Sequence, residues 1–112
     1  MAAILKPAQV TSLKVLGFLY LRLGAFDRAG RLFQALARLF PEDAELAKSL
    51  AAAELEMGHA QRALALLSAS PLAELASDPA LLLLKARAHW RLEQNEAAFA
   101  VMDVYLSRNQ KT

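Results

Sequence analysis

The chain has 112 residues, no cysteine and a formal net charge of +2, so disulfide frameworks and thiolate chemistry are excluded. Hydrophobic residues make up 56% of it, and most of the excess is Ala and Leu. Because these residues favour helices and β-branched residues are scarce, the composition predicts an all-α fold. The length predicts a single domain, residues 1–112.

The charge is unevenly distributed. Residues 1–41 carry six bases and one acid, residues 42–84 two bases and seven acids, and residues 85–112 five bases and three acids. This alternation does not form a continuous basic stripe, so no nucleic-acid partner is predicted.

No apolar run reaches the length of about 18 residues that a membrane span needs, so no membrane insertion is predicted. The segment Met1–Lys6 is too short for a secretory signal. We therefore expect a cytoplasmic protein. The mean hydropathy of +0.26 is high for so short a chain, which predicts that a partner covers part of its surface.

The first third of the chain shows how the helices are separated. Gly17 lies inside an apolar run, where glycine costs about 1 kcal/mol relative to alanine in a helix. A second helix that comes too close for a Cβ atom explains that cost. Gly24 ends this helix, and Pro41 ends the next one. Apolar residues with helical spacing lie between them at Phe26, Ala29 and Phe33. The pattern predicts a helical hairpin of about 34 residues.

The same spacing continues along the chain. Gly58 follows Gly24 by 34 residues, and Glu93 stands 35 residues after Gly58, where the next glycine is expected. Pro71 shortens the fourth helix and leaves room for one loose helical turn, and Asp78 caps the fifth helix, which begins at Pro79. The expected helices are residues 11–23 (with Pro7 as an alternative start), 26–40, 44–57, 60–69, 79–92 and a sixth that ends near Ser107.

Helical spacing also predicts the side chains that face the core. In the first helix these are Leu13, Leu16, Gly17 and Tyr20, with Leu23 as a further candidate and Phe18 and Leu21 beside them. In the second helix they are Ala29, Leu32, Phe33, Leu36 and Leu39.

The first hairpin resembles the tetratricopeptide repeat. The residues at its signature positions are Leu13, Leu16, Gly17, Tyr20, Gly24, Phe26, Ala29, Phe33 and Pro41. The second repeat keeps Leu50, Gly58, Ala63 and Leu67, and the third keeps Ala86 and Ala98, with Met102 at the position of Phe33. The resemblance implies three hairpins, at about residues 10–43, 44–78 and 79–112, stacked in a short right-handed superhelix.

More narrowly, the chain resembles the small chaperones of bacterial type III secretion. The stretches 17–29 and 36–42 are most similar to the YscY type. That resemblance implies a chaperone of the bacterial cytoplasm that binds and stabilises a small secreted protein of the YscX type as a heterodimer, assists its export and acts with the export gate. A needle-subunit co-chaperone of the YscG type, a generic tetratricopeptide scaffold or adaptor, and a homodimer that covers its own groove remain alternatives.

In a tetratricopeptide stack, the first helix of each hairpin lines a concave groove. The repeat register assigns three sets of residues to it: Thr11, Lys14, Phe18, Leu21 and Arg22; Glu45, Lys48, Ala52, Leu55 and Glu56; Ala80, Leu83, Arg87, Trp90 and Arg91. The middle of this set is apolar and its rim is charged, as in sites that bind a partner helix. The alternative is that the apolar members belong to the core.

Other functions have less support in the sequence. Lys14, Lys48, Arg87 and Arg91 imitate part of a clamp for a peptide carboxylate, but the asparagines of such clamps are absent. The two histidines, His59 and His89, lack metal-ligand spacing, and no nucleophile stands beside a base. We therefore expect no enzymatic activity, no cofactor, no metal and no small-molecule substrate.

Overall fold

The structure of the protein is a computed structural model that describes residues 5–75 and 78–109. This part of the chain forms six α-helices and a short 3-10 helix at Leu72–Leu75, with no strand. The α-helices are α1 (Pro7–Arg22), α2 (Phe26–Leu39), α3 (Ala44–Glu56), α4 (Ala60–Ser68), α5 (Pro79–Arg91) and α6 (Asn95–Asn109). The all-α prediction is confirmed. The end of the third predicted repeat, residues 110–112, lies outside the described residues.

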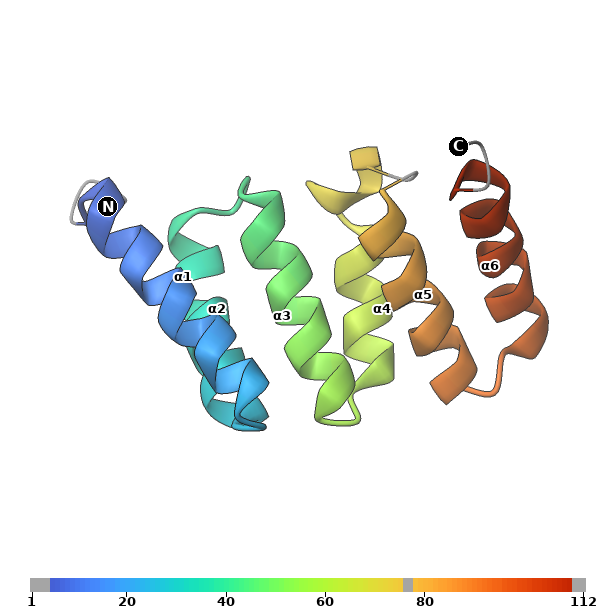
Figure 1. The fold of residues 1–112 in the computed structure, drawn as a ribbon, viewed down its shortest axis with the longest axis horizontal. Helices are drawn as coiled ribbons and strands as arrows, with labels where there is room; N and C mark the ends of the chain where they lie inside the picture. Colours follow the sequence, from blue (N-terminus) through green and yellow to red (C-terminus); the bar gives the residue numbers. More distant parts are fainter. Residues whose placement is uncertain (1–4, 76–77, 110–112) are drawn as a thin grey trace.

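The helices lie side by side in chain order along the long axis of the molecule (Figure 1). Each helix packs against the next one in the sequence, and α3 also contacts both α1 and α5. The extents of 44 × 28 × 24 Å reflect this row. The first and last helices therefore lie at opposite ends, and each has a flank that no described helix covers.

Left-handed residues separate the two helices of each pair. Gly24 and Gly58 have φ angles of 79° and 85°, and Glu93 has a φ angle of 60°. The predicted correspondence of Glu93 with the two glycines is therefore confirmed. Such a conformation strains a residue that carries a Cβ atom. The side chain of Glu93 is exposed, so it encounters no packed neighbour there.

Aspartates cap α3 and α5. The Leu46 N–H donates to Asp43 Oδ1 at 3.2 Å, and the Ala80 N–H donates to Asp78 Oδ1 at 2.9 Å. The predicted roles of Asp78 and Pro79 are confirmed. Of the two starts considered for the first helix, the structure has Pro7, where the missing N–H costs nothing.

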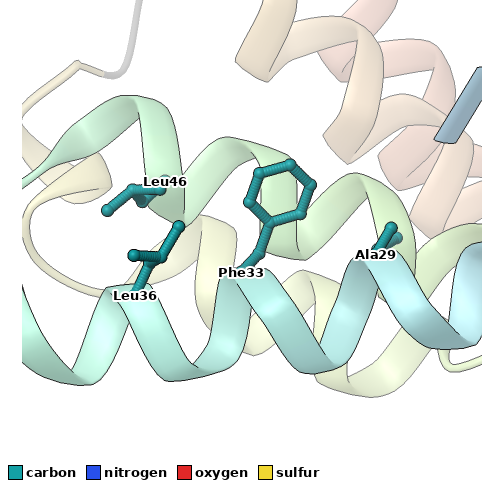
Figure 2. Packing of buried hydrophobic residues seen from close by; sticks show 5 residues of the cluster. Ala29, Phe33, Leu36 and Leu46 are labelled. Carbon is teal, nitrogen blue, oxygen red and sulfur yellow. The ribbon is translucent and has the colours of Figure 1, made fainter. Parts of the chain in front are cut away.

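The core of the first three helices surrounds Phe33. Figure 2 shows Ala29, Phe33 and Leu36 on one face of α2, with Leu46 of α3 beside Leu36. All four are buried. A Cβ atom added to Gly17 would lie 2.5 Å from Phe33 Cζ. The close approach predicted at Gly17 is therefore confirmed, and the atom group that fills the space is the ring of Phe33.

The predicted inner face of the first helix needs a correction. Leu16 and Leu23 are exposed, the latter to 72%, whereas Phe18 and Leu21 pack against the core around Phe33. The rings of Phe18 and Phe33 have centroids 5.5 Å apart. The prediction is therefore confirmed for Leu13, Gly17 and Tyr20, which pack inward, and wrong for Leu16 and for the further candidate Leu23. Repeat spacing does not distinguish the flank of α1 that meets α2 from the flank that no described helix covers.

We predict that Gly17→Ala destabilises the fold by about 1–3 kcal/mol, because the new methyl group displaces a fully buried ring. Gly30→Ala is the matched control, since its Cβ atom would come closest to the flexible end of Met57, at 2.9 Å. That change gains helix propensity and should be close to neutral. Thermal unfolding followed by circular dichroism measures both, and equal midpoints would contradict the proposed role of Gly17.

Candidate functional site

An exposed apolar hollow lies near the C-terminal end of the row, between α5 and α6. Its volume is about 320 Å³. Trp90 and Phe99 are its main walls: they are 57% and 58% exposed, and their ring centroids lie 6.0 Å apart. We call this hollow the end pocket; its lining is Leu83, Ala86, Arg87, Trp90, Arg91, Ala98, Phe99 and Met102. It can accept apolar side chains from another protein.

Two arginines form the polar part of the end pocket. Arg87 Nη2 donates to Glu56 Oε2 of α3 at 2.9 Å, and Arg91 Nη1 donates to the Leu55 carbonyl at 3.1 Å. Arg91 forms no ion pair among the described residues. A guanidinium has five N–H donors, so Arg91 keeps donors for a carboxylate of a partner.

Lysines of α1 and α3 connect successive helix pairs. Lys14 Nζ donates to Asp43 Oδ2 at 2.8 Å and to Glu45 Oε1 at 3.1 Å, and Lys48 Nζ donates to Asp78 Oδ2 at 3.2 Å. In each case the lysine binds the aspartate that caps the next odd-numbered helix. The corresponding residue of α5, 35 positions after Lys48, is Leu83, which lines the end pocket.

The ion pairs shift the ionisation of their members. The hydrogen bond to Asp43 raises the pKa of Lys14 above its ordinary value of 10.5. Burial raises the pKa of Asp43, but hydrogen bonds from Lys14 and the Leu46 N–H outweigh it and leave the pKa below its ordinary 3.8. Burial likewise raises the pKa of Asp78, and the bonds from Lys48 and the Ala80 N–H bring it below 3.8. Both carboxylates are therefore ionised in the folded chain at neutral pH.

The structure brings only some of the predicted groove residues together. Leu83, Arg87, Trp90 and Arg91 meet in the end pocket. Leu55 is fully buried and belongs to the core, so its assignment to an open groove is wrong. Phe18 and Leu21 pack on the first core, and Ala52 is half-buried, whereas Arg22 is exposed. Of the apolar members of the predicted groove, Leu55 is therefore a core residue, whereas Leu83 and Trp90 are exposed together in the end pocket.

The position of the cations also bears on the alternative of a carboxylate clamp. Lys14, Lys48 and Arg87 are each already paired with a carboxylate of the chain, and Arg91 is bonded to a carbonyl. Three of the four candidate cations thus serve to join helix pairs. This arrangement does not support a clamp.

Phe99 and Met102 are site residues that the predicted groove does not include. The repeat register places Met102 at the packing position that Phe33 holds in the first pair, and it gives no role to Phe99. The available signal was that these two apolar residues stand three positions apart, on one face of the last predicted helix. Because no described helix covers that face, Met102 is only half-buried, whereas Phe33 at the corresponding position is fully buried.

The two histidines each contact a neighbouring polar side chain. His59 Nδ1 lies 3.4 Å from Glu54 Oε1, and His89 is half-buried with Nδ1 2.7 Å from Gln94 Oε1. No group of three or more potential metal-binding side chains occurs in residues 5–75 and 78–109. Within the same ranges, no helix is both long enough and apolar enough to cross a bilayer.

Comparison with known proteins does not assign the chain to a family. No family model matches the chain, and no curated protein matches it.

We predict that the fold loses stability in acid through Asp43 and Asp78. A carboxylate whose pKa is lowered by folding stabilises the native state above its unfolded pKa of about 4, and this contribution disappears as the pH falls through the folded value. The double variant Asp43→Asn, Asp78→Asn should be less stable at pH 7 and should lose less on acidification. Urea unfolding between about pH 6 and pH 3 tests this. Asp27→Asn is the control, because the ion pair that Asp27 forms with Arg31 is exposed. Equal pH dependence in all three proteins would contradict the prediction.

We also predict unequal stability losses for the two aromatic residues that the repeat register assigns to the groove. Phe18→Ala removes a ring packed on Phe33 and should cost about 3 kcal/mol. Trp90→Ala removes a ring that is 57% exposed and should cost less than about 1 kcal/mol. Chemical denaturation of both variants measures the difference. A larger loss for Trp90→Ala would place that ring in the core.

Proposed function

We propose that this chain is a tetratricopeptide-type chaperone of bacterial type III secretion, most similar to the YscY type. It binds a small secreted partner of the YscX type as a heterodimer in the cytoplasm and assists its delivery to the export gate. The observation that carries this proposal is the end pocket, an exposed apolar hollow with two aromatic walls at one end of the helical row.

The helix arrangement supports the tetratricopeptide part of the proposal. Three helix pairs are separated by left-handed residues at 34- and 35-residue intervals. The first helices of successive pairs contact each other, α1 with α3 and α3 with α5. These features are expected of three hairpins in a right-handed superhelix. The resemblance of the first hairpin to the repeat signature agrees with them.

The proposed mechanism is sequestration of a helical segment. An amphipathic helix buries its apolar face on Trp90, Phe99 and Leu83, which removes apolar surface of both proteins from water. The partner is thereby kept from aggregating until it is exported. This mechanism requires no bond-making step, no cofactor and no metal.

The experiment is co-expression of the chain with a YscX-type protein encoded in the same genome. We predict a 1:1 complex whose unfolding midpoint exceeds that of the free chain, because a partner at 100 times its dissociation constant adds about 2.7 kcal/mol. Trp90→Ala should weaken binding by about 2 kcal/mol, as truncation of a central aromatic residue does.

The matched control is Phe26→Ala, a half-buried aromatic residue at the start of α2, far along the row from the end pocket. Absence of a complex with the YscX-type protein would refute the proposal. Stable binding of a needle subunit with its co-chaperone in the same assay would replace it with the YscG-type function.

A further inference from the structure

The end pocket corresponds to a surface that is covered elsewhere in the chain. In the middle of the row, α5 packs over α3 and α4, and it buries Ala51 and Leu67 beneath Leu81, and Leu55 and Ala63 beneath Ala88. Counted 35 residues further along the sequence, these four buried residues correspond to Ala86, Met102, Trp90 and Ala98, all of which line the end pocket.

Burial differs sharply at the place of Leu55. Ala86 and Ala98 are buried like their counterparts, and Met102 is half-buried. Leu55 is 0% exposed because α5 covers it, whereas Trp90 is 57% exposed because no described helix lies over it. The shape of the pocket is therefore that of a seat for one more helix, in the position that α5 takes on α3 and α4. The apolar stripe of such a helix follows that of α5, with apolar residues at the places of Leu81, Leu84 and Ala88.

The charge on this helix follows from the ion pairs. Between α3 and α5, Glu56 pairs with Arg87 at 2.9 Å. The residue of α5 that corresponds to Glu56 is Arg91. The charge at this repeat position is therefore negative in α3 and positive in α5. A helix seated in the end pocket must therefore carry a carboxylate where α5 carries Arg87, and Arg91 has the donors to bind it.

A second copy of the chain does not meet this requirement. Its α1 does have an exposed apolar stripe, with Val15, Leu19 and Leu23 at the places of Leu84, Ala88 and Leu92. However, α1 has Phe18 at the place of Arg87, and residues 1–41 carry six bases and one acid. Docking of α1 would bring that basic segment to Arg91 without supplying a carboxylate.

We propose that the end pocket binds an acidic amphipathic helix of the partner, seated as α5 is seated on α3 and α4, with a carboxylate on Arg91. This inference rests on the proposed function, because it describes the partner of that function. The partner helix has apolar residues at positions i, i+3 or i+4, and i+7, and it has Asp or Glu one position before the last of these.

Synthetic peptides with the sequence of residues 43–57 provide a probe. In the chain, this segment packs on the preceding helices through Leu46, Leu50 and Ala53, and its residue at the place of Arg87 is Ala52. The acidic peptide carries Ala52→Glu, and the basic peptide carries Ala52→Lys. The serine peptide combines Ala52→Glu with Leu46→Ser and Leu50→Ser. All three peptides also carry Ala44→Glu, and a lactam joins this side chain to Lys48. The lactam lies away from the apolar stripe and stabilises the helical conformation of the peptide.

Trp90 is the only tryptophan of the chain, and these peptides contain none, so its emission reports occupancy of the end pocket. The acidic peptide should shift the emission to shorter wavelength and saturate, the basic peptide should bind at least about fivefold more weakly, and the serine peptide should not bind. Arg91→Glu should reverse the preference between the acidic and basic peptides. Arg91→Gln, which keeps a donor for the Leu55 carbonyl, should abolish it.

The outcomes separate this inference from the proposed function. Equal affinity for the acidic and basic peptides, or no binding of any peptide, would overturn the acidic-helix assignment even if the YscX-type partner binds. Charge-selective peptide binding by a chain that does not bind that partner would overturn the proposed function but would support the end pocket as a binding site for an acidic helix. Concentration-dependent self-association that Trp90→Ala abolishes would assign the pocket to a second copy and overturn the inference.

Discussion

The packing of α5 across α3 and α4 is the interaction on which the burial pattern of the row depends. A helix pair has two flanks, and a pair in the middle of a row buries both. Leu55 and Ala63 are buried because Ala88 lies over them. The same flank of the last pair has no described helix above it, which leaves Trp90 and Phe99 exposed. The proposed binding site is thus a core position of the repeat that lacks its cover.

The polar contacts between helix pairs hold the start of each following pair against the preceding one. Each N-terminal aspartate of α3 and α5 performs two functions, since it caps its own helix and accepts from a lysine of the preceding odd-numbered helix. Apolar contacts alone are not directional, whereas a cap and an ion pair on one carboxylate define the position of the helix start. Leu83 stands where a third lysine would be and leaves the end of the row apolar.

Local structure is the level at which the sequence is most informative. The glycines at positions 24 and 58 and the prolines at positions 41 and 79 locate the helix ends to within one or two residues, because backbone constraints act within a few residues of their origin. The sequence leaves the start of the first helix open between Pro7 and a cap near residue 11, and the structure has Pro7. The close approach at Gly17 is also predictable, although its partner atom group is not. The wrong predictions concern helix faces: helical spacing assigns Leu16 and Leu23 inward, and the repeat register assigns Leu55 to an open groove.

The local sequence is enough to show that a helix has an apolar stripe, because the apolar residues recur with helical spacing. Whether the stripe becomes core or surface depends on what packs over it. Leu55 and Trp90 occupy the same place in successive repeats, yet one is completely buried and the other is 57% exposed. The sequence by itself therefore determined the helices, their caps and their period. Only the tertiary structure decided which apolar residues form the core and which lie open at the surface, because burial is set by neighbours that lie far away in the chain.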